Sequence, residues 1–399
     1  MPLFFSYARP SVRLPVGRHF LPSLFLSALL LTPVLLLAQA PQPQQEDQKV
    51  IENDKKPTPE IVQPIVEPAS PSEEKIGPVR LLFAGDTHFL WGVRDQQSRR
   101  GLLSPVEKIR PLFLGADYRV INLETVVAPE GKSVNHKTYI FRSDPENLSV
   151  LKHLSVQGLF LANNHTFDLG LPGIEQTLTH VAAAELSYSG IGKNEAEAIK
   201  PFVTEVQGLR IAFFSISTVG RYDTFAGATR PGTAQPSPAF FAELRRARST
   251  ADFVVVGVHW GNEYELFPNN EQRDLARKLV RDGADAVIGH HPHVPQGTEF
   301  INGRPVVYSL GNFLFGSANY QQTHNLIAVL RIDRKTKRAI AVELHPITGR
   351  YRSDGYVIDM PREEERTAFW EEIYLLCQKL NPAQNIVFED GLRRMVITP

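Results

Sequence analysis

Residues 285–296 read DAVIGHHPHVPQ and place His290, His291 and His293 just past a short apolar run that ends in glycine. Clustered imidazoles indicate a metal site, because neutral imidazole binds zinc, manganese or iron. His291 and His293 are two residues apart, so an extended backbone projects both rings to the same side, where they reach one or two adjacent ions. The stretch therefore predicts a strand that ends in metal ligands.

Four other segments show the same pattern, an apolar strand-like run followed at once by Asp, Glu, Asn or His. Strands that are buried on both faces read as continuous apolar runs, and ligands gather at the carboxyl ends of parallel strands. The five runs together predict an α/β fold with one shared site. The four segments are RLLFAGDTH with Asp86 and His88, YRVINLE with Asn122 and Glu124, GLFLANNH with Asn163, Asn164 and His165, and FVVVGVHWG with His259.

These strand ends supply enough donors for a metal centre. A lone buried histidine is more often a hydrogen-bonded core residue, but five such strand ends favour a site. One ion needs about four to six nitrogen or oxygen donors, and a two-ion site also needs a bridging carboxylate. We expect one or two divalent transition-metal ions, with Mn, Zn and Fe as the alternatives. The predicted ligands are Asp86, His88, Glu124, Asn164, His259, His291 and His293.

The ordered motifs resemble a known family. The series GDTH, INLE, LANNHTFDLG, VHWGNEYE, GHHPHVPQG and YSLGNFLF is similar to that of the CapA family, the poly-γ-glutamate capsule synthesis proteins, whose domain is similar to calcineurin-like metallophosphoesterases. The resemblance spans residues 79–350. It implies a metallophosphoesterase-like fold, a four-layer αββα sandwich of two mixed sheets with a dinuclear site at the strand ends.

The resemblance also implies roles for single residues. His165 corresponds to a histidine that does not bind metal, so it is the candidate catalytic residue, which donates a proton or stabilises charge. The G-D-x-x-D element appears only as Asn122-Leu123-Glu124, which makes Glu124 the expected bridge between the ions. The other matches are Asp86 and His88 with D-x-H, Asn164 and His165 with G-N-H, His259 with the isolated histidine, and His291 and His293 with G-H-x-H.

Five further residues are candidates for substrate binding. Lys137 and Arg142 in HKTYIFRSDPE offer a point charge and a planar fork for a carboxylate or phosphate, with a solvated pair of surface charges as the alternative. Glu263 and Tyr264 follow His259 closely and either contact substrate or orient a metal histidine. Asn312 in YSLGNF belongs to the loop expected over the site and is the fifth candidate.

The two ends of the chain are predicted to lie outside this domain. Residues 1–40 carry an arginine-led apolar segment that ends in Ala38-Gln39-Ala40, a pattern typical of a signal peptide. Pro41 would directly follow the cleavage point, where proline is poorly tolerated, so an uncleaved membrane anchor is the alternative. Residues 41–78 are rich in proline and charge, which predicts a disordered linker. The domain of residues 79–350 is then extracytoplasmic, and residues 351–399 form a helical C-terminal extension.

Secondary-structure patterns within the domain support the α/β assignment. Hairpin turns are expected at Gln207-Gly208 and Asn302-Gly303, and a third hairpin at RKTKR, residues 334–338. Helices are predicted near 104–115, 171–184, 238–248, 269–282 and 362–380, and strands near 79–85, 118–123, 157–162, 252–258 and 285–289.

Three functions fit these residues. The first is a metal-dependent hydrolase or transferase of capsule or cell-envelope polymer biosynthesis that acts on an anionic polymer or envelope substrate. The second is a non-catalytic component that binds or exports the polymer together with membrane-bound capsule synthesis proteins, and the third is a phosphoesterase. A formal net charge of +0 and a pI near 7.2 leave no basic field for nucleic acid, so none is expected as a partner.

Overall fold

The computed structural model describes residues 77–134, 137–349 and 351–399. The chain divides into two units, Met1–Ser70 and Pro71–Pro399, and every described residue belongs to the second. The predicted signal or anchor segment, and all but the last two residues of the predicted linker, lie outside the described residues. Within the described part of the chain, no helix is both long enough and apolar enough to cross a membrane.

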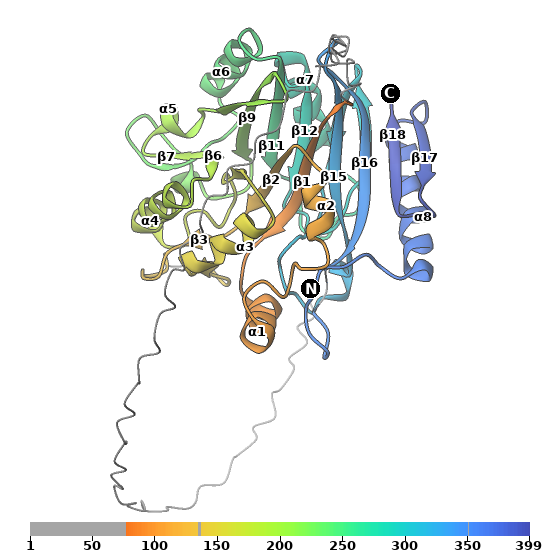
Figure 1. Ribbon diagram of the computed structural model, residues 1–399. Coiled ribbons are helices and arrows are strands. Elements are labelled where there is room, and N and C mark those ends of the chain that lie inside the picture. Colours follow the sequence, from red (N-terminus) through yellow and green to blue (C-terminus); the bar gives the residue numbers. More distant parts are fainter. Residues whose placement is uncertain (1–76, 135–136, 350) are drawn as a thin grey trace, which may run out of the picture. The chain divides into compact units, whose positions relative to one another are not determined.

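Two mixed sheets form the centre of the described unit (Figure 1). The larger sheet has, in spatial order, β17 (Asn385–Glu389), β18 (Arg394–Thr398), β16 (Arg338–Thr348), β15 (His324–Asp333), β1 (Val79–Thr87), β2 (Tyr118–Leu123), β5 (Gly158–Phe160) and β6 (Ser187–Ser189). Strands β1, β2, β5 and β6 run parallel, whereas β15, β16, β18 and β17 pair antiparallel.

The smaller sheet has, in spatial order, β13 (Thr298–Ile301), β14 (Arg304–Val307), β12 (Ala286–His290), β11 (Phe253–His259), β9 (Leu209–Ser217) and β8 (Phe202–Val206). Its four central strands are parallel, and β8 and β13 add antiparallel edges. Two short pairs complete the strands: β3 (Val126–Val127) with β4 (Arg142–Ser143), and β7 (Ile191–Gly192) with β10 (Gly232–Thr233).

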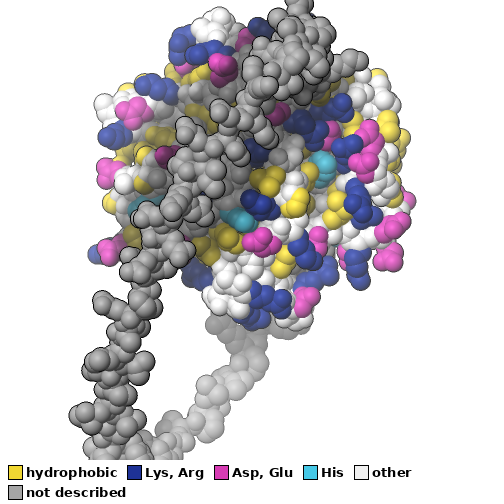
Figure 2. Space-filling view, viewed as in Figure 1, with side chains coloured by type: hydrophobic (Ala, Val, Ile, Leu, Met, Phe, Trp, Pro, Cys, Tyr) yellow, Lys and Arg dark blue, Asp and Glu magenta, His cyan; other side chains and the backbone are white. Residues whose placement is uncertain are grey.

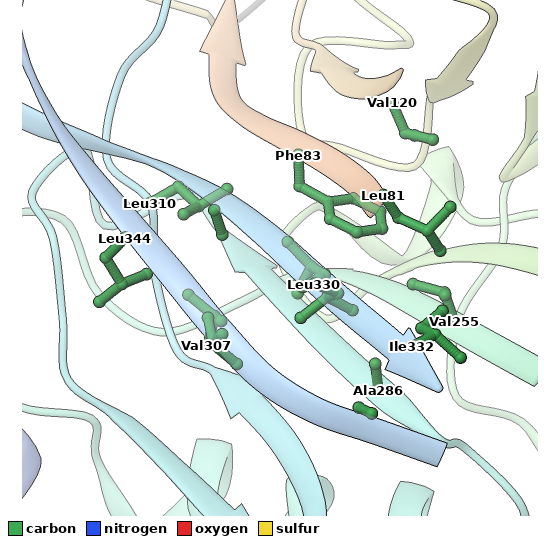
Figure 3. Packing of buried hydrophobic residues seen from close by; sticks show 14 of the residues in the cluster. Leu81, Phe83, Val120, Val255, Ala286, Val307, Leu310, Leu330, Ile332 and Leu344 are labelled. Carbon is green, nitrogen blue, oxygen red and sulfur yellow. The ribbon is translucent and has the colours of Figure 1, made fainter. Parts of the chain in front are cut away.

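The core between the sheets follows from alternation along each strand. Leu81 and Phe83 of β1 point between the sheets and pack with residues of the smaller sheet such as Val255 (Figure 3). The intervening residues Leu82 and Ala84 belong to a second cluster on the opposite face. Because both faces are buried, β1 reads as a continuous apolar run, as expected of a central strand.

Helices cover the outer face of each sheet. Buried residues of α1 (Trp91–Arg100), α2 (Arg110–Leu114), α3 (Leu148–His153) and α4 (Gly170–Ala183) pack on the larger sheet. Those of α5 (Glu195–Ala198), α6 (Pro238–Arg248) and α7 (Asn270–Asp282) pack on the smaller one. Helix, sheet, sheet and helix form four layers, so the predicted αββα sandwich of two mixed sheets is confirmed.

The three predicted hairpins are also confirmed, as β8–β9, β13–β14 and β15–β16. The helix predicted at 104–115 is wrong over most of its length. Only Arg110–Leu114 is helical, and the preceding residues form turns in which, for example, the Ile109 amide donates to the Val106 carbonyl. Pro105 and Pro111 lack backbone N–H groups, which opposes a continuous helix through this segment.

The C-terminal extension contains more than the predicted helix. Helix α8 (Glu363–Leu380) buries Phe369, Trp370, Ile373 and Cys377 in the cluster that lies between the sheets. The strands β17 and β18 follow it and add a hairpin to the edge of the larger sheet, at the right of Figure 1. The residues after 380 were not predicted as strands, so the extension is a helix plus a hairpin.

Charged side chains of both signs lie on the face that Figure 2 shows. On the coloured part of the face that Figure 2 shows, Lys and Arg alternate with Asp and Glu. This distribution agrees with the formal net charge of +0. Any preference for an anionic ligand must therefore come from a local site.

Candidate metal centre

The carboxyl ends of five strands meet at one place. Strands β1, β2 and β5 are neighbours in the larger sheet, and β11 and β12 are neighbours in the smaller sheet. Because the strands of each set are parallel, their carboxyl ends share one edge of their sheet, and ligand atoms from the two edges approach one another within 4.8 Å. The residues brought there are Asp86 of β1, Glu124 after β2, Asn164 and His165 after β5, His259 at the end of β11, and His291 and His293 after β12.

Two groups of potential ligands share one carboxylate. Glu124, His291 and His293 form one group, and Asp86, Glu124 and His259 form the other. Within each group the ligand atoms lie within 4.8 Å of one another. A carboxylate common to both groups is the arrangement that a two-ion site requires, and Glu124 stands at that position.

Glu124 also shows why these residues fit a cation. Its side chain is fully buried, and neither carboxylate oxygen has a hydrogen-bond partner. Burial and the nearby charge of Asp86 raise the pKa of Glu124 well above its usual range. An ionised carboxylate without donors is costly in the interior, whereas a bound divalent ion would satisfy both oxygens and favour the charged form.

Two oxygen acceptors hold the ring of His293 through its Nδ1 atom. Its Nδ1 lies 2.9 Å from Oδ1 of Asn312 and 3.2 Å from Oδ2 of Asp86. Nδ1 therefore carries the proton and donates, which leaves the Nε2 lone pair for an ion. Without an ion, burial lowers the pKa of His293, but the charge of Glu124 and the hydrogen bond to Asp86 raise it to about 9, so a bound ion would displace a proton from Nε2.

The backbone that carries His291 and His293 is not extended. Their φ angles are +95° and +57°, in the left-handed region that residues other than glycine rarely adopt. The Asp86 carboxylate holds this turn by accepting the His291 amide at 3.1 Å. The predicted meeting of the two rings at one group is found, but the strand alternation assumed for it is wrong. Non-glycine residues in such conformations concentrate at functional sites.

Asn122 orients two members of the cluster. Its Nδ2 donates to Oδ1 of Asp86 at 2.7 Å and lies 3.4 Å from Nδ1 of His259. The other ring nitrogen of His259, Nε2, lies 2.8 Å from Oδ1 of Asn164 and 3.6 Å from Oε1 of Glu124. Asn164, His259 and Glu124 thus present atoms toward one another at spacings compatible with a shared ion.

His88 differs from the other predicted ligands. It belongs to neither ligand group. Its Nδ1 accepts the Leu90 amide at 3.1 Å, and its buried Nε2 has no hydrogen-bond partner. The ring packs 4.1 Å from the ring of Phe315. His88 therefore lies beside the two groups and holds a nitrogen that an ion or a substrate atom would satisfy.

His165 forms a buried pair with Asp168. Its Nδ1 lies 2.7 Å from Oδ2 of Asp168, and its Nε2 lies 3.8 Å from Oε1 of Glu124. Lys137 donates to the same aspartate and to the Asn164 carbonyl. Burial lowers the pKa of His165, although Asp168 opposes that shift. The pair holds one imidazole nitrogen toward the metal groups, which suits proton transfer.

The other substrate candidates occupy different positions. Arg142 is exposed on β4, where it pairs with Val126, outside the buried cluster. Tyr264 is partly exposed, and its ring lies 6.5 Å from that of His293. Glu263 is exposed, and its charge contributes to the raised pKa of Glu124. Asn312 is fully buried, and its Oδ1 accepts from Nδ1 of His293, so in this structure it orients that ring.

Sequence reasoning did not assign the orienting roles of Asn122, Asp168 and Asn312. Each contacts a predicted site residue through its side chain. All three lie in the quoted motifs, so proximity to a motif was the available signal. Asp168 contacts His165 three residues before it, whereas Asn122 and Asn312 contact Asp86 and His293, which are distant enough in the sequence that the pairing is not apparent from it.

The quoted motifs lie within the part of the chain that matches a known protein family. The family model described as "Bacterial capsule synthesis protein PGA_cap" matches residues 80–317. The chain is 34% identical over 237 residues to the PGA biosynthesis protein CapA of Bacillus subtilis, covering 58% of this chain and 62% of that protein. It is 32% identical over 248 residues to the capsule biosynthesis protein CapA of Bacillus anthracis, covering 59% of each. The match thus spans less than two thirds of these relatives.

Solved structures resemble the chain more distantly. A putative 5'-nucleotidase from Staphylococcus aureus, in complex with alpha-ketoglutarate, has a TM-score of 0.43 and 16% identity, covering 74% of this chain and 58% of that one.

Proposed function

The chain belongs to the bacterial capsule synthesis protein family PGA_cap, and from that membership we propose that it is a metal-dependent hydrolase or transferase of poly-γ-glutamate capsule synthesis. Its substrate is an anionic glutamyl polymer, and it works outside the cytoplasm alongside membrane-bound capsule synthesis proteins. The names of the CapA relatives of Bacillus subtilis and Bacillus anthracis support the pathway. The proposed chemistry rests on the residues of the metal centre.

The observation that carries the proposal is the position of Glu124. A fully buried carboxylate with two unpartnered oxygens stands where two groups of potential ligands meet. Such a buried charge costs several kcal/mol when it is unpaired, and a bound cation would offset that cost. The arrangement supports a site for divalent metal.

Divalent ions at such a site activate water and stabilise the developing oxyanion. The side chains contribute the rest. Asp168 holds Nδ1 of His165, so Nε2 faces the reaction centre, where it can take a proton from the attacking water and then pass it to the leaving group. Lys137, anchored on Asp168, places a positive charge at the same edge, where it attracts a substrate carboxylate.

The test is hydrolysis of a synthetic γ-glutamyl pentamer by metal-loaded protein. We expect His165→Ala to keep its metal and its affinity for the pentamer while turnover falls by about a hundredfold or more, the usual contribution of a positioned acid or base. His153→Ala, a partly exposed histidine of α3, serves as the matched control. A parent protein that binds the pentamer and never cleaves or transfers it would support the polymer-binding alternative, and cleavage of phosphate esters alone would support a phosphoesterase.

A further inference from the structure

A set of aromatic side chains borders the metal centre on one side. We call Trp91, Tyr139, Phe141 and Phe315 the aromatic wall. The Phe141 ring stacks on His165 with centroids 3.8 Å apart and planes 15° apart. Because His165 is the proposed proton donor, one end of the wall touches the reacting group directly.

The wall continues outward from there to the surface. The Trp91 ring lies 5.3 Å from that of Phe141 and 5.6 Å from that of Phe315, in edge-to-face geometry. Tyr139 lies edge-on to Trp91 at 5.9 Å. Such spacings are those of favourable aromatic pairs. Ring contacts therefore run without a break from His165 to the outermost pair.

That outermost pair is exposed and lines a cavity. Trp91 is 42% exposed and Tyr139 is 60% exposed. Both line a cavity of about 590 Å³, together with Asp95, Asn319 and Tyr351. Trp91 also has a φ of +50°, a conformation that a bulky residue rarely adopts. A large side chain held in a rare conformation beside a cavity indicates a binding role rather than a packing role.

The described residues that line the cavity offer no unpaired cation for an anionic group. Asp95 is the only Asp, Glu, Lys or Arg among its described lining residues. Its Oδ1 lies 2.9 Å from Nε of Arg99, and its Oδ2 accepts the Tyr351 hydroxyl at 2.8 Å. A carboxylate placed here would face the electron-rich ring faces, and Arg99, the cation beside the lining, is already paired with Asp95. The cavity suits an uncharged group that can stack on a ring.

We propose that this cavity is a substrate subsite in which Trp91 stacks on the uncharged amide and methylene stem of a polymer unit next to the one that reacts. The inference rests on the proposed function, because that function supplies the glutamyl polymer as the substrate. In a γ-glutamyl chain the amide and its two methylenes are neutral, and the carboxylate of each unit branches from them. Trp91 thus contacts the main chain of the polymer, whereas Lys137 lies at the edge of the metal centre, where a substrate carboxylate is favoured.

The tryptophans of the chain make the subsite measurable. Trp260 and Trp370 are each 1% exposed, so quenching by acrylamide reports on Trp91. The full-length protein is titrated with three probes. These are the γ-glutamyl pentamer, a blocked γ-aminobutyryl trimer that keeps the amides and methylenes without carboxylates, and glutarate, which has carboxylates without an amide. We expect the pentamer and the trimer to protect Trp91 from quenching and glutarate to leave it accessible.

Affinity is then measured by calorimetry in variants. Trp91→Ala should weaken binding of the trimer about tenfold, the contribution of one stacking contact, and Trp91→Phe should restore most of it. Tyr139→Ala should weaken it as well and guards against a folding defect of the first variant. Tyr222→Ala, at a site 79% exposed, is the matched control and should not change affinity.

The outcomes separate the subsite from the reaction. Protection by glutarate but not by the trimer, or equal trimer affinity in the parent protein and Trp91→Ala, would overturn the subsite. Protection of Trp91 by the pentamer without any turnover would keep the subsite and remove the proposed chemistry. Turnover of the pentamer with an unchanged KM in both Trp91→Ala and Tyr139→Ala would keep the chemistry and remove the subsite.

Discussion

Replacing Asp168 with asparagine should separate the orientation of His165 from the binding of metal. The Asp168 carboxylate is fully buried and receives three donors. They are Nδ1 of His165 at 2.7 Å, the Phe141 amide at 2.7 Å, and Nζ of Lys137. Asparagine keeps the shape and one acceptor oxygen, but it replaces the other oxygen with an NH₂ group that faces a donor.

The contacts set the size of the effect on stability. The variant loses at least one charge-assisted hydrogen bond, each of which contributes about 1.5–3 kcal/mol. Lys137 is 22% exposed on its side chain, so water can hydrate its ammonium group and limits the further penalty. We therefore expect the free energy of unfolding to fall by about 2–3 kcal/mol.

The effect on turnover is larger, because the proton position on His165 depends on Asp168. Without the carboxylate, His165 loses the negative charge that favours its protonated form, and general acid catalysis typically contributes about a hundredfold to ten-thousandfold. Turnover of the γ-glutamyl pentamer should fall by that factor. The metal content should stay that of the parent, since Asp168 belongs to neither ligand group.

Three measurements check this prediction: urea unfolding, elemental analysis and the rate of pentamer hydrolysis. Asp274→Asn, which removes an exposed carboxylate of α7 that pairs with Arg277, is the matched control and should change none of them appreciably. Turnover within threefold of the parent would refute the orienting role of Asp168. Loss of metal in parallel with turnover would refute the separation of the two functions.

Three further changes test other parts of the structure. Gly85→Ala places a Cβ 2.0 Å from the Gly311 carbonyl oxygen, so we expect the free energy of unfolding to fall by about 1–3 kcal/mol. Because the neighbouring Asp86 would shift, calorimetry should also show weaker metal binding. An unchanged affinity for metal would contradict this effect of the close approach. Burial alone would raise the pKa of Glu343, but the nearby His345 and the hydrogen-bonded Arg80 guanidinium hold it at about 2. Because the folded pKa lies below the ordinary 4.5, this stabilisation is present above pH 4.5 and is lost as the pH falls towards 2. The free energy of unfolding of Glu343→Gln should therefore lack the pH dependence between those values. A pH profile of unfolding like that of the parent would contradict the role of Glu343. Alkaline phosphatase fused after Ser70 should be active, since the arginine-led segment of residues 1–40 predicts export; activity of a cytoplasmic reporter instead would reverse the topology.

The central strands were predictable because their pattern is strong and local. Strand β1 alternates Leu81 and Phe83 toward one core with Leu82 and Ala84 toward the other, so all four positions had to be apolar. The polar site residue then follows near the end of the strand, where the chain leaves the two apolar layers that cover it. Such strand ends are visible in the sequence without any knowledge of their neighbours.

Helix α1 and the hairpin β17–β18 carry weaker patterns. Helix α1 buries only Gly92, Val93 and Gln96, so it lacks an apolar stripe at helical spacing. Most of β17 is exposed or half-buried at an edge of the sheet, which leaves little alternation to read. Both elements are stabilised mainly by what they pack against, and that contact is not encoded locally.

Within the site, the residue types were predictable and the contacts were not. The family resemblance predicted Glu124 as the bridge, but its unpartnered oxygens became apparent only once the two sheets were brought together. The turn that carries His291 and His293 depends on the Asp86 carboxylate, which lies about 200 residues earlier in the chain. Long-range contacts of this kind set the orientation of each ring.

Metal stoichiometry of the parent protein and of Glu124→Gln tests the central claim most directly. Elemental analysis and calorimetry with manganese and zinc should give two ions per chain for the parent and one or none for Glu124→Gln, because the shared carboxylate is lost from both groups. Glu299→Gln removes a buried carboxylate that accepts the Tyr308 hydroxyl outside the cluster, and it should bind as the parent does. A parent protein that binds no divalent metal, or a Glu124→Gln variant that binds both ions with unchanged affinity, would contradict the account.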